Sequence, residues 1–154
     1  MSILNSLYNY IKLCPLLQES SNGILSLKVD YSQSDNVTSY SINETVCKPE
    51  LKTYVNGDSE NQFIFTLTSI EHFGSDEDVN ITNIYFYEQF AQWLKSNSFK
   101  KILPTMEEGQ TPSKIKALTG GYLFDNAADA TTARYCIQVQ LIYDQKNNIW
   151  KKDE

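Results

Sequence analysis

Arginine and histidine are almost missing from this sequence of 154 residues. Of its 13 basic residues all but Arg134 are lysines, which restricts bidentate recognition of phosphate or carboxylate to one position. His72 is the only histidine, and no third group that could orient it beside a nucleophile is indicated. Because so little remains from which an active site could be built, we predict that the protein is not an enzyme.

Cysteine is scarce as well. Cys14, Cys47 and Cys136 are odd in number, lie far apart and form no CxxC pair. This pattern is typical of reduced thiols that pack like small hydrophobic residues in an intracellular protein. One histidine and three isolated cysteines do not match the ligand spacings of a zinc site, so we expect no metal.

The series Asp76, Asp78, Asn80 and Thr82 has the every-second-residue spacing of a calcium loop that starts at Asp76. It lacks the glycine at the sixth position, where Ile81 stands, and the glutamate at the twelfth, where Tyr87 stands. We interpret it as a solvated loop in which Asp78 or Asn80 caps the helix that follows.

The net charge of -6 and the pI near 4.8 argue against binding to nucleic acid through its phosphates. No signal peptide is recognisable at the N-terminus, and no apolar run reaches the roughly 18 residues needed to span a bilayer. From these absences we expect a soluble protein of the cytoplasm.

Hydrophobic periodicity predicts one α+β domain over residues 1–146, followed by a short tail at 147–154. The expected sheet is mostly antiparallel, with an N-terminal helix (2–13) and a long central helix (84–96) packed on it. Strands are expected at 25–31, 40–46, 51–55, 62–70 and 133–143, with a hairpin turn at Asn56-Gly57-Asp58. The segment 109–112 is predicted to be a loop, and 125–132 a polar link.

Two glycines in sequence, Gly120 and Gly121, are not part of a phosphate-binding loop, because no Gly-Lys-Ser/Thr follows them. We predict instead that they let a strand bend or let its backbone approach a neighbouring element.

Aromatic residues are abundant, and five of them gather on the predicted central helix. This aromatic cluster consists of Tyr85, Phe86, Tyr87, Phe90 and Trp93. One interpretation is a helix buried in the core of the domain. The other places part of the cluster in a subunit interface, where Tyr, Phe and Trp are enriched.

Several segments together resemble a family of small proteins from tailed bacteriophages and prophages of Gram-positive bacteria, the minor capsid proteins of the tail-terminator or tail-completion type. The resemblance extends over nearly the whole chain in the same order. The segments are 5–11 (NSLYNYI), 14–17 (CPLL), 40–42 (YSI), 52–58 (KTYVNGD), 86–94 (FYEQFAQWL), 109–112 (GQTP), 117–124 (ALTGGYLF), 132–135 (TARY) and 138–143 (QVQLIY).

This resemblance implies an α+β subunit that assembles, commonly as a hexameric ring, at the head-proximal end of the tail tube. Its implied partners are copies of itself, the tail tube protein and the neck or head-completion proteins, and the resemblance implies no cofactor. DNA would pass through the lumen without specific binding, and an acidic chain with little arginine suits such a channel. As candidates for acidic lumen or partner loops we name Asp76, Glu77, Asp78, Asp125 and Asp129.

Three other functions remain open. A head-completion or neck connector protein shares the size, the acidity and the ring. A monomeric intracellular module that binds an extended peptide along a sheet edge belongs to a different class. A small enzyme that uses His72 is the third alternative.

Overall fold

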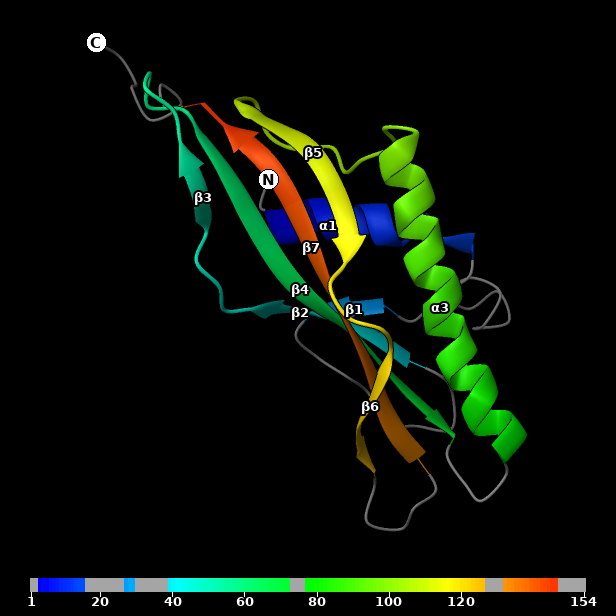
Figure 1. Ribbon diagram of the computed structural model, residues 1–154. Coiled ribbons are helices and arrows are strands. Elements are labelled where there is room, and N and C mark those ends of the chain that lie inside the picture. Colours follow the sequence, from blue (N-terminus) through cyan, green and yellow to red (C-terminus); the bar gives the residue numbers. More distant parts are fainter. Residues whose placement is uncertain (1–2, 16–26, 30–38, 73–76, 127–131, 147–154) are drawn as a thin grey trace.

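The computed structural model describes residues 3–15, 27–29, 39–72, 77–126 and 132–146 (Figure 1). The predicted tail at 147–154 lies outside these residues. In chain order the elements are α1 (Ile3–Ile11), β1 (Leu27–Val29), β2 (Ser39–Thr45), β3 (Glu50–Thr53), β4 (Ser59–His72), α3 (Glu77–Phe99), β5 (Gln110–Ala117), β6 (Tyr122–Asn126) and β7 (Thr132–Gln145).

The described strands form one sheet around two long central strands, β4 and β7, which pair along their full length. Each has two short partners placed end to end on its outer side. β4 pairs with β3 near its start and with β2 near its end, and β7 pairs with β6 and then β5. Every pairing is antiparallel except β1 with β2, so the predicted α+β fold with a mostly antiparallel sheet is confirmed.

One face of the sheet carries the core. The register pairs Phe65 with Val139 and Leu67 with Ile137, which places alternate side chains of β4 and β7 on the same face. All four side chains are fully buried. The alternation predicted for these two strands is therefore confirmed, and the continuous apolar face explains why both strands can be central.

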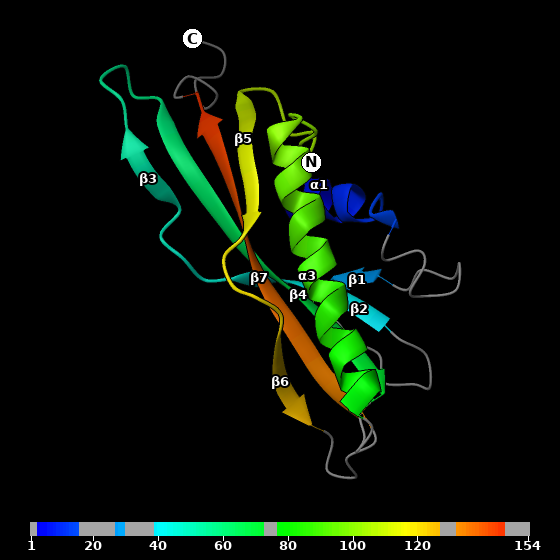
Figure 2. The same cartoon turned by 45° about the vertical axis from the view of Figure 1, so that its right-hand side comes forward.

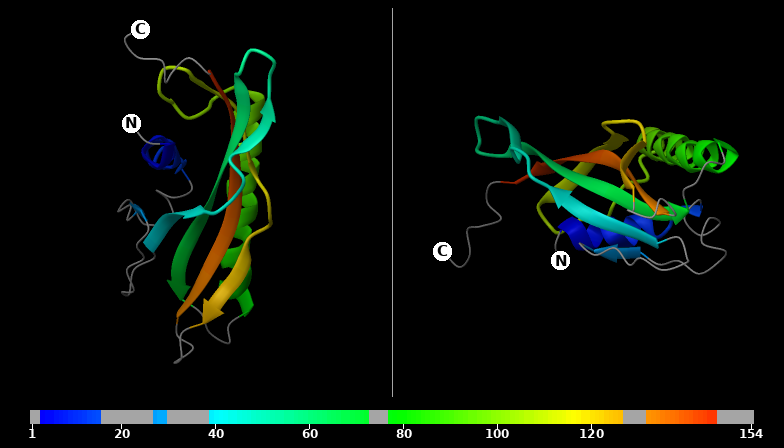
Figure 3. Two further views of the ribbon diagram at one scale, coloured as in Figure 1. Left: turned by 90° about the vertical axis from the view of Figure 1, so that its left-hand side faces the viewer. Right: turned by 90° about the horizontal axis from the view of Figure 1, so that it is seen from below.

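Both helices contribute to this core. Leu7, Tyr10 and Ile11 of α1 and Leu94 of α3 belong to the same buried cluster as the strand residues. The helices also meet each other, because the rings of Tyr10 and Trp93 lie 5.3 Å apart between centroids. Figure 3 shows α1 standing off one face of the sheet, and Figure 2 shows α3 running beside β5.

The hairpin predicted between the third and fourth strands is confirmed. Tyr54 and Asp58 are joined by a backbone hydrogen bond of 2.7 Å, and the amide of Gly57 donates to the carbonyl of Tyr54. Gly57 has φ of 91°, a left-handed conformation in which a glycine has no Cβ to clash. Val55, however, was predicted to lie in the strand and is exposed in the turn.

Three boundary predictions were wrong. Residues 110–112 are not a loop but the start of β5, an edge strand that tolerates Pro112 because its register shifts next to that residue. Asp125 is not in a link but in β6, where it pairs with Arg134, because β5 has ended and β7 still offers backbone partners. Asp78 and Asn80 lie inside α3, which begins at Glu77, so neither is its N-cap.

Candidate interaction surfaces

The aromatic cluster of α3 is mostly core. Tyr87 and Phe90 have no exposed surface and pack inside the chain, as the core interpretation of the cluster expects. Phe86 and Trp93 are half-buried and pack against the core. Tyr85 alone is 55% exposed and remains available to a partner.

Tyr87 is held in place by hydrogen bonds as well as by packing. Its hydroxyl donates to the backbone carbonyl of Tyr135 at 3.0 Å and lies 2.5 Å from the hydroxyl of Ser69. A buried hydroxyl with two partners is fully satisfied. The polar end of this residue therefore fastens α3 to the two central strands.

The link between β5 and β6 passes very close to the same tyrosine. A Cβ added to Gly121 would lie 2.3 Å from Cβ of Tyr87, far inside van der Waals contact, whereas one added to Gly120 would meet nothing within 4 Å. The prediction that these glycines allow a close backbone approach is confirmed at Gly121. Its absent side chain is what allows the link to touch the helix.

The acidic candidates are distributed over two segments. Glu77 and Asp78 open α3, and Asp125 lies in β6, while Asp76 and Asp129 are outside the described residues. His72 is the last residue of β4. Within the described part of the chain no group of three or more His, Cys, Asp or Glu side chains is arranged to hold a metal ion.

No disulfide links the cysteines. Cys14 and Cys136 are buried, as predicted for thiols packed like small hydrophobic residues, and Cys47 is half-buried. Burial raises the pKa of the Cys136 thiol, although the hydroxyl of Thr68 and the charge of Arg134 act in the opposite direction. A raised pKa keeps this thiol protonated and poorly nucleophilic near neutral pH.

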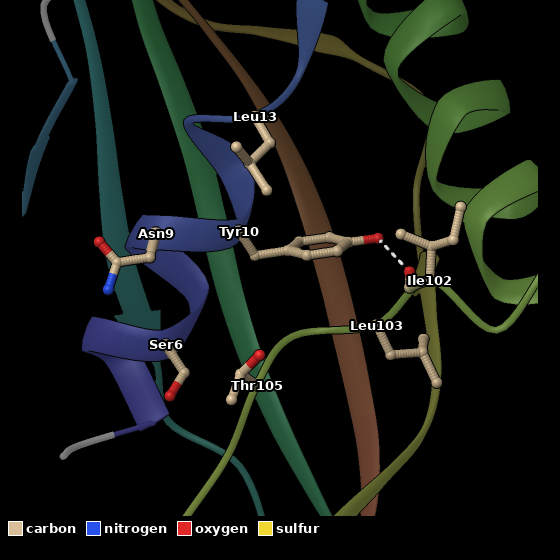
Figure 4. A pocket seen from close by; sticks show the side chains of 7 residues that line it. All are labelled: Ser6, Asn9, Tyr10, Leu13, Ile102, Leu103 and Thr105. Carbon is tan, nitrogen blue, oxygen red and sulfur yellow. Dashed lines mark hydrogen bonds between the residues drawn. The ribbon is translucent and has the colours of Figure 1, made fainter.

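A shallow hollow of about 290 Å³ lies between α1 and the segment that follows α3 (Figure 4). Its base is Tyr10, whose hydroxyl donates to the carbonyl of Ile102 at 2.9 Å and accepts from the side-chain amide of Asn97 at 3.1 Å. Partial burial raises the pKa of this phenol. The remaining lining residues are Ser6, Asn9, Leu13, Leu103 and Thr105.

Large apolar side chains that were not predicted to be exposed lie on the surface at two separate places. Leu51, Tyr54 and Val55 lie on the β3–β4 hairpin. Phe99, which is 89% exposed, ends α3 beside β5. The exposure of Phe99 could have been predicted from the sequence. Lys100 and Lys101 follow it directly, and two charged residues are rarely buried at a helix end.

Neither a scan against models of known protein families nor a search of curated proteins found a match for this chain. Among the described residues, no helix is both long enough and apolar enough to cross a membrane.

Proposed function

We propose that this protein is a tail terminator, a structural subunit that forms a ring at the head-proximal end of a phage tail tube. In that position the ring stops polymerisation of the tube and joins the tail to the neck. The protein is then a virion component that assembles in the cytoplasm of the host bacterium. The resemblance of segments between residues 5 and 143, all in family order, is the first support for this proposal.

The structural observation that carries the proposal is the exposure of large apolar side chains at two separate places, on the β3–β4 hairpin and at the C-terminal end of α3. Tyr54 and Val55 lie in the connection between β3 and β4, and Phe99 is the last residue of α3, beside β5. A subunit of a cyclic ring contacts each of its two neighbours through a different surface, so it needs two separate patches. Exposed aromatic and aliphatic side chains supply the desolvated centre of such contacts.

The ring subunit in this proposal is the sheet with the N-terminal helix and the long central helix packed on it. Tyr85 is the member of the aromatic cluster that remains for a neighbouring subunit.

The acidic segments support an assignment of the lumen. The N-terminal end of α3, with Glu77 and Asp78, and the end of β6, with Asp125, lie at the same end of the molecule (Figure 1). We propose that this end faces the lumen, where carboxylates repel the DNA backbone and leave the DNA mobile. The assignment fails if this end of the subunit lies on the outer rim of the ring.

Electron microscopy of the purified protein tests the proposal most directly. Rings in projection, together with shortened tubes when the protein is added to polymerising tail tube protein, are the expected result. Tube protein alone, and tube protein with an unrelated acidic protein of similar size, are the controls for the length distribution. A stable monomer at high concentration that leaves tube length unchanged would contradict the proposal.

Two outcomes would assign a different function to the protein. If labelled protein in intact particles lies at the portal and does not cap the tube, the protein is a head-completion or neck connector. If sedimentation gives only monomers that bind extended peptides, it is a binding module that adds a strand to the sheet edge.

A further inference from the structure

The outer face of α3 carries an exposed row of residues at the spacing of one helical stripe. This exposed row consists of Tyr85, Glu88, Gln92, Lys95 and Phe99, each three or four positions after the one before. Residues at this spacing lie on one face of a helix. Both ends of the row therefore present an aromatic ring to solvent. Figure 1 shows α3 along one side of the molecule, where a second chain can reach this face.

Charge is distributed unevenly along α3. Its acidic residues are Glu77, Asp78 and Glu88, whereas its only lysine is Lys95. Carboxylates in the first turn stabilise a helix through its macrodipole, which accounts for Glu77 and Asp78. That effect does not account for Glu88 and Lys95, which lie more than one turn from either end. Neither has an oppositely charged residue three or four positions away, so they form no ion pair along their own helix.

The C-terminal end of α3 is followed by two more lysines, Lys100 and Lys101. The amide of Lys101 donates to the carbonyl of Ser98 at 3.2 Å. The amide of Ile102 donates to the carbonyl of Asn97 at 2.8 Å, and the two bonds form a Schellman motif. Lys101 has φ of 62°, a left-handed conformation in which glycine is the usual residue. A positive charge thus stands at a position where the backbone of a lysine is strained.

Lysines of β5 continue this positive region beside the helix. A groove of about 370 Å³ lies between the C-terminal part of α3 and β5. Lys95 and Lys101 line it from the helix side, and Lys114 and Lys116 line it from the strand. All the charged side chains that line the groove are lysines, so a partner that approaches this part of α3 meets positive charge.

The exposed row is complementary to itself when a second copy is turned end for end. Reversing a helix exchanges residues about a centre, and the pairs Glu88–Lys95 and Tyr85–Phe99 have nearly the same centre, next to Gln92. In an antiparallel pair of helices, Glu88 of each copy therefore faces Lys95 of the other, and each Tyr85 lies beside a Phe99. A twofold contact requires this property, because each contact in it occurs twice. A parallel pair would instead bring like charges together, which repel.

We propose that two copies of this chain pair through the exposed rows of their α3 helices, antiparallel about a twofold axis near Gln92. Glu88 and Lys95 supply two symmetric ion pairs, and the aromatic rings supply the apolar contacts. The acidic start of each helix then lies toward the lysines that follow the end of the other helix. The two helix dipoles are antiparallel, and their ends attract in the same arrangement.

The pairing does not rest on the proposed function, although it competes with it for the same surface. The pair covers Tyr85 and Phe99, which the proposed ring also uses, so one subunit cannot make both contacts at the same time. A contact of one helix from each copy is smaller than a permanent interface, and we expect a dissociation constant in the micromolar range or weaker. Pairs of that strength separate when subunits are drawn into a ring.

Nucleic acid is the less suitable occupant of this face. Glu88 lies within the exposed row, and the net charge of -6 repels DNA as a whole. A second copy of the chain matches both charges of the row and both of its aromatic ends.

Charge reversal tests the arrangement. Glu88→Lys alone and Lys95→Glu alone each place like charges across both symmetric contacts, so we expect each to weaken pairing at least about tenfold. A chain that carries both substitutions exchanges the two charges and restores both attractions, so it should pair like the unchanged protein. An equal mixture of the two single variants is complementary as well, and it should form mixed pairs.

Phe99→Ser tests the apolar contacts, and it should weaken pairing at least about tenfold because a ring is lost at both ends of the pair. Glu108→Lys and Lys48→Glu are the matched controls, since they reverse the same charges at exposed positions outside α3. Both controls should pair like the unchanged protein. Sedimentation equilibrium up to about 1 mM protein gives the dissociation constants. Circular dichroism shows whether each variant is folded.

The contrary outcomes are distinct. An unchanged protein that stays monomeric up to about 1 mM overturns the pairing directly. Pairing that both single reversals leave unchanged shows that the copies meet through another surface. Loss of pairing in the single variants without recovery in their mixture or in the double variant overturns the antiparallel arrangement. Retardation of DNA in a gel by the unchanged protein, lost in Lys95→Glu, would assign this face to nucleic acid.

Discussion

Replacing Gly121 by alanine should destabilise the fold strongly, although it adds only one methyl group. The new Cβ would lie 2.3 Å from Cβ and 2.6 Å from Cγ of Tyr87, whereas ordinary contact begins at 3.4 Å. Because Cβ is fixed to the helix backbone, no rotation of the tyrosine side chain relieves the clash. The link and α3 must therefore separate by about 1 Å, in a core where close packing leaves little room.

The magnitude follows from the contacts of Tyr87. Overpacking of this kind costs about 1–3 kcal/mol. A shift of α3 also strains the hydrogen bonds of the Tyr87 hydroxyl to Ser69 and Tyr135, and losing one adds about 1 kcal/mol. We expect a loss of about 2–4 kcal/mol in the free energy of unfolding. For a domain of this size that lowers Tm by roughly 5–15 °C.

Gly120→Ala is the matched control, because a Cβ at Gly120 meets nothing within 4 Å. Both substitutions reduce the entropy of the unfolded chain to the same extent, so their difference isolates the contact with Tyr87. Urea unfolding followed by tryptophan fluorescence and by circular dichroism measures both variants. A difference between them below about 0.5 kcal/mol would refute the reasoning, since surface substitutions fall within that range.

Three further predictions concern single side chains. Tyr87→Phe leaves buried polar partners unsatisfied and should lower the free energy of unfolding by about 1–3 kcal/mol, whereas Tyr85→Phe at an exposed position should change it by less than about 0.5 kcal/mol. Lys101→Gly should raise it by about 0.5–1 kcal/mol by relieving the left-handed strain, and a loss of stability would contradict the assigned helix end. When the folded protein reacts with a thiol reagent near pH 7, Cys47 should react first and Cys136 only slowly. Cys136 should react faster once the pH approaches its raised pKa or urea unfolds the chain. Equal rates for the two thiols at pH 7 would show that Cys136 is accessible.

Local patterns predicted much of the sheet. The alternation along β4 and β7 identified their buried faces, because a strand with one face in a core repeats every two residues. Asn56-Gly57 identified the hairpin turn, because only a few residues adopt its backbone conformation. The boundaries at 110–112 and at Asp125 were wrong for one reason: a proline or an acidic residue argues against a strand locally, and backbone partners on β7 outweigh that tendency.

The candidate interaction surfaces were less predictable. Of the five aromatic residues of α3, the sequence could not separate Tyr85 from Tyr87, because a helix with aromatic residues on several sides has no unique buried face. The tertiary contacts of Ser69, Tyr135 and Gly121 determine that Tyr87 is the buried one.

By itself, the sequence determined which chemistry is scarce, which strands have an apolar face and where the chain turns. Composition sets the first of these properties. The other two depend on residues close together in the chain, through the two-residue period of a strand and the backbone sterics of a turn. Only the tertiary structure placed Glu60 opposite Asp144 and brought Lys101 and Lys114 to one groove. Those juxtapositions depend on strand order and on the packing of α3 beside β5, which join residues far apart in the chain.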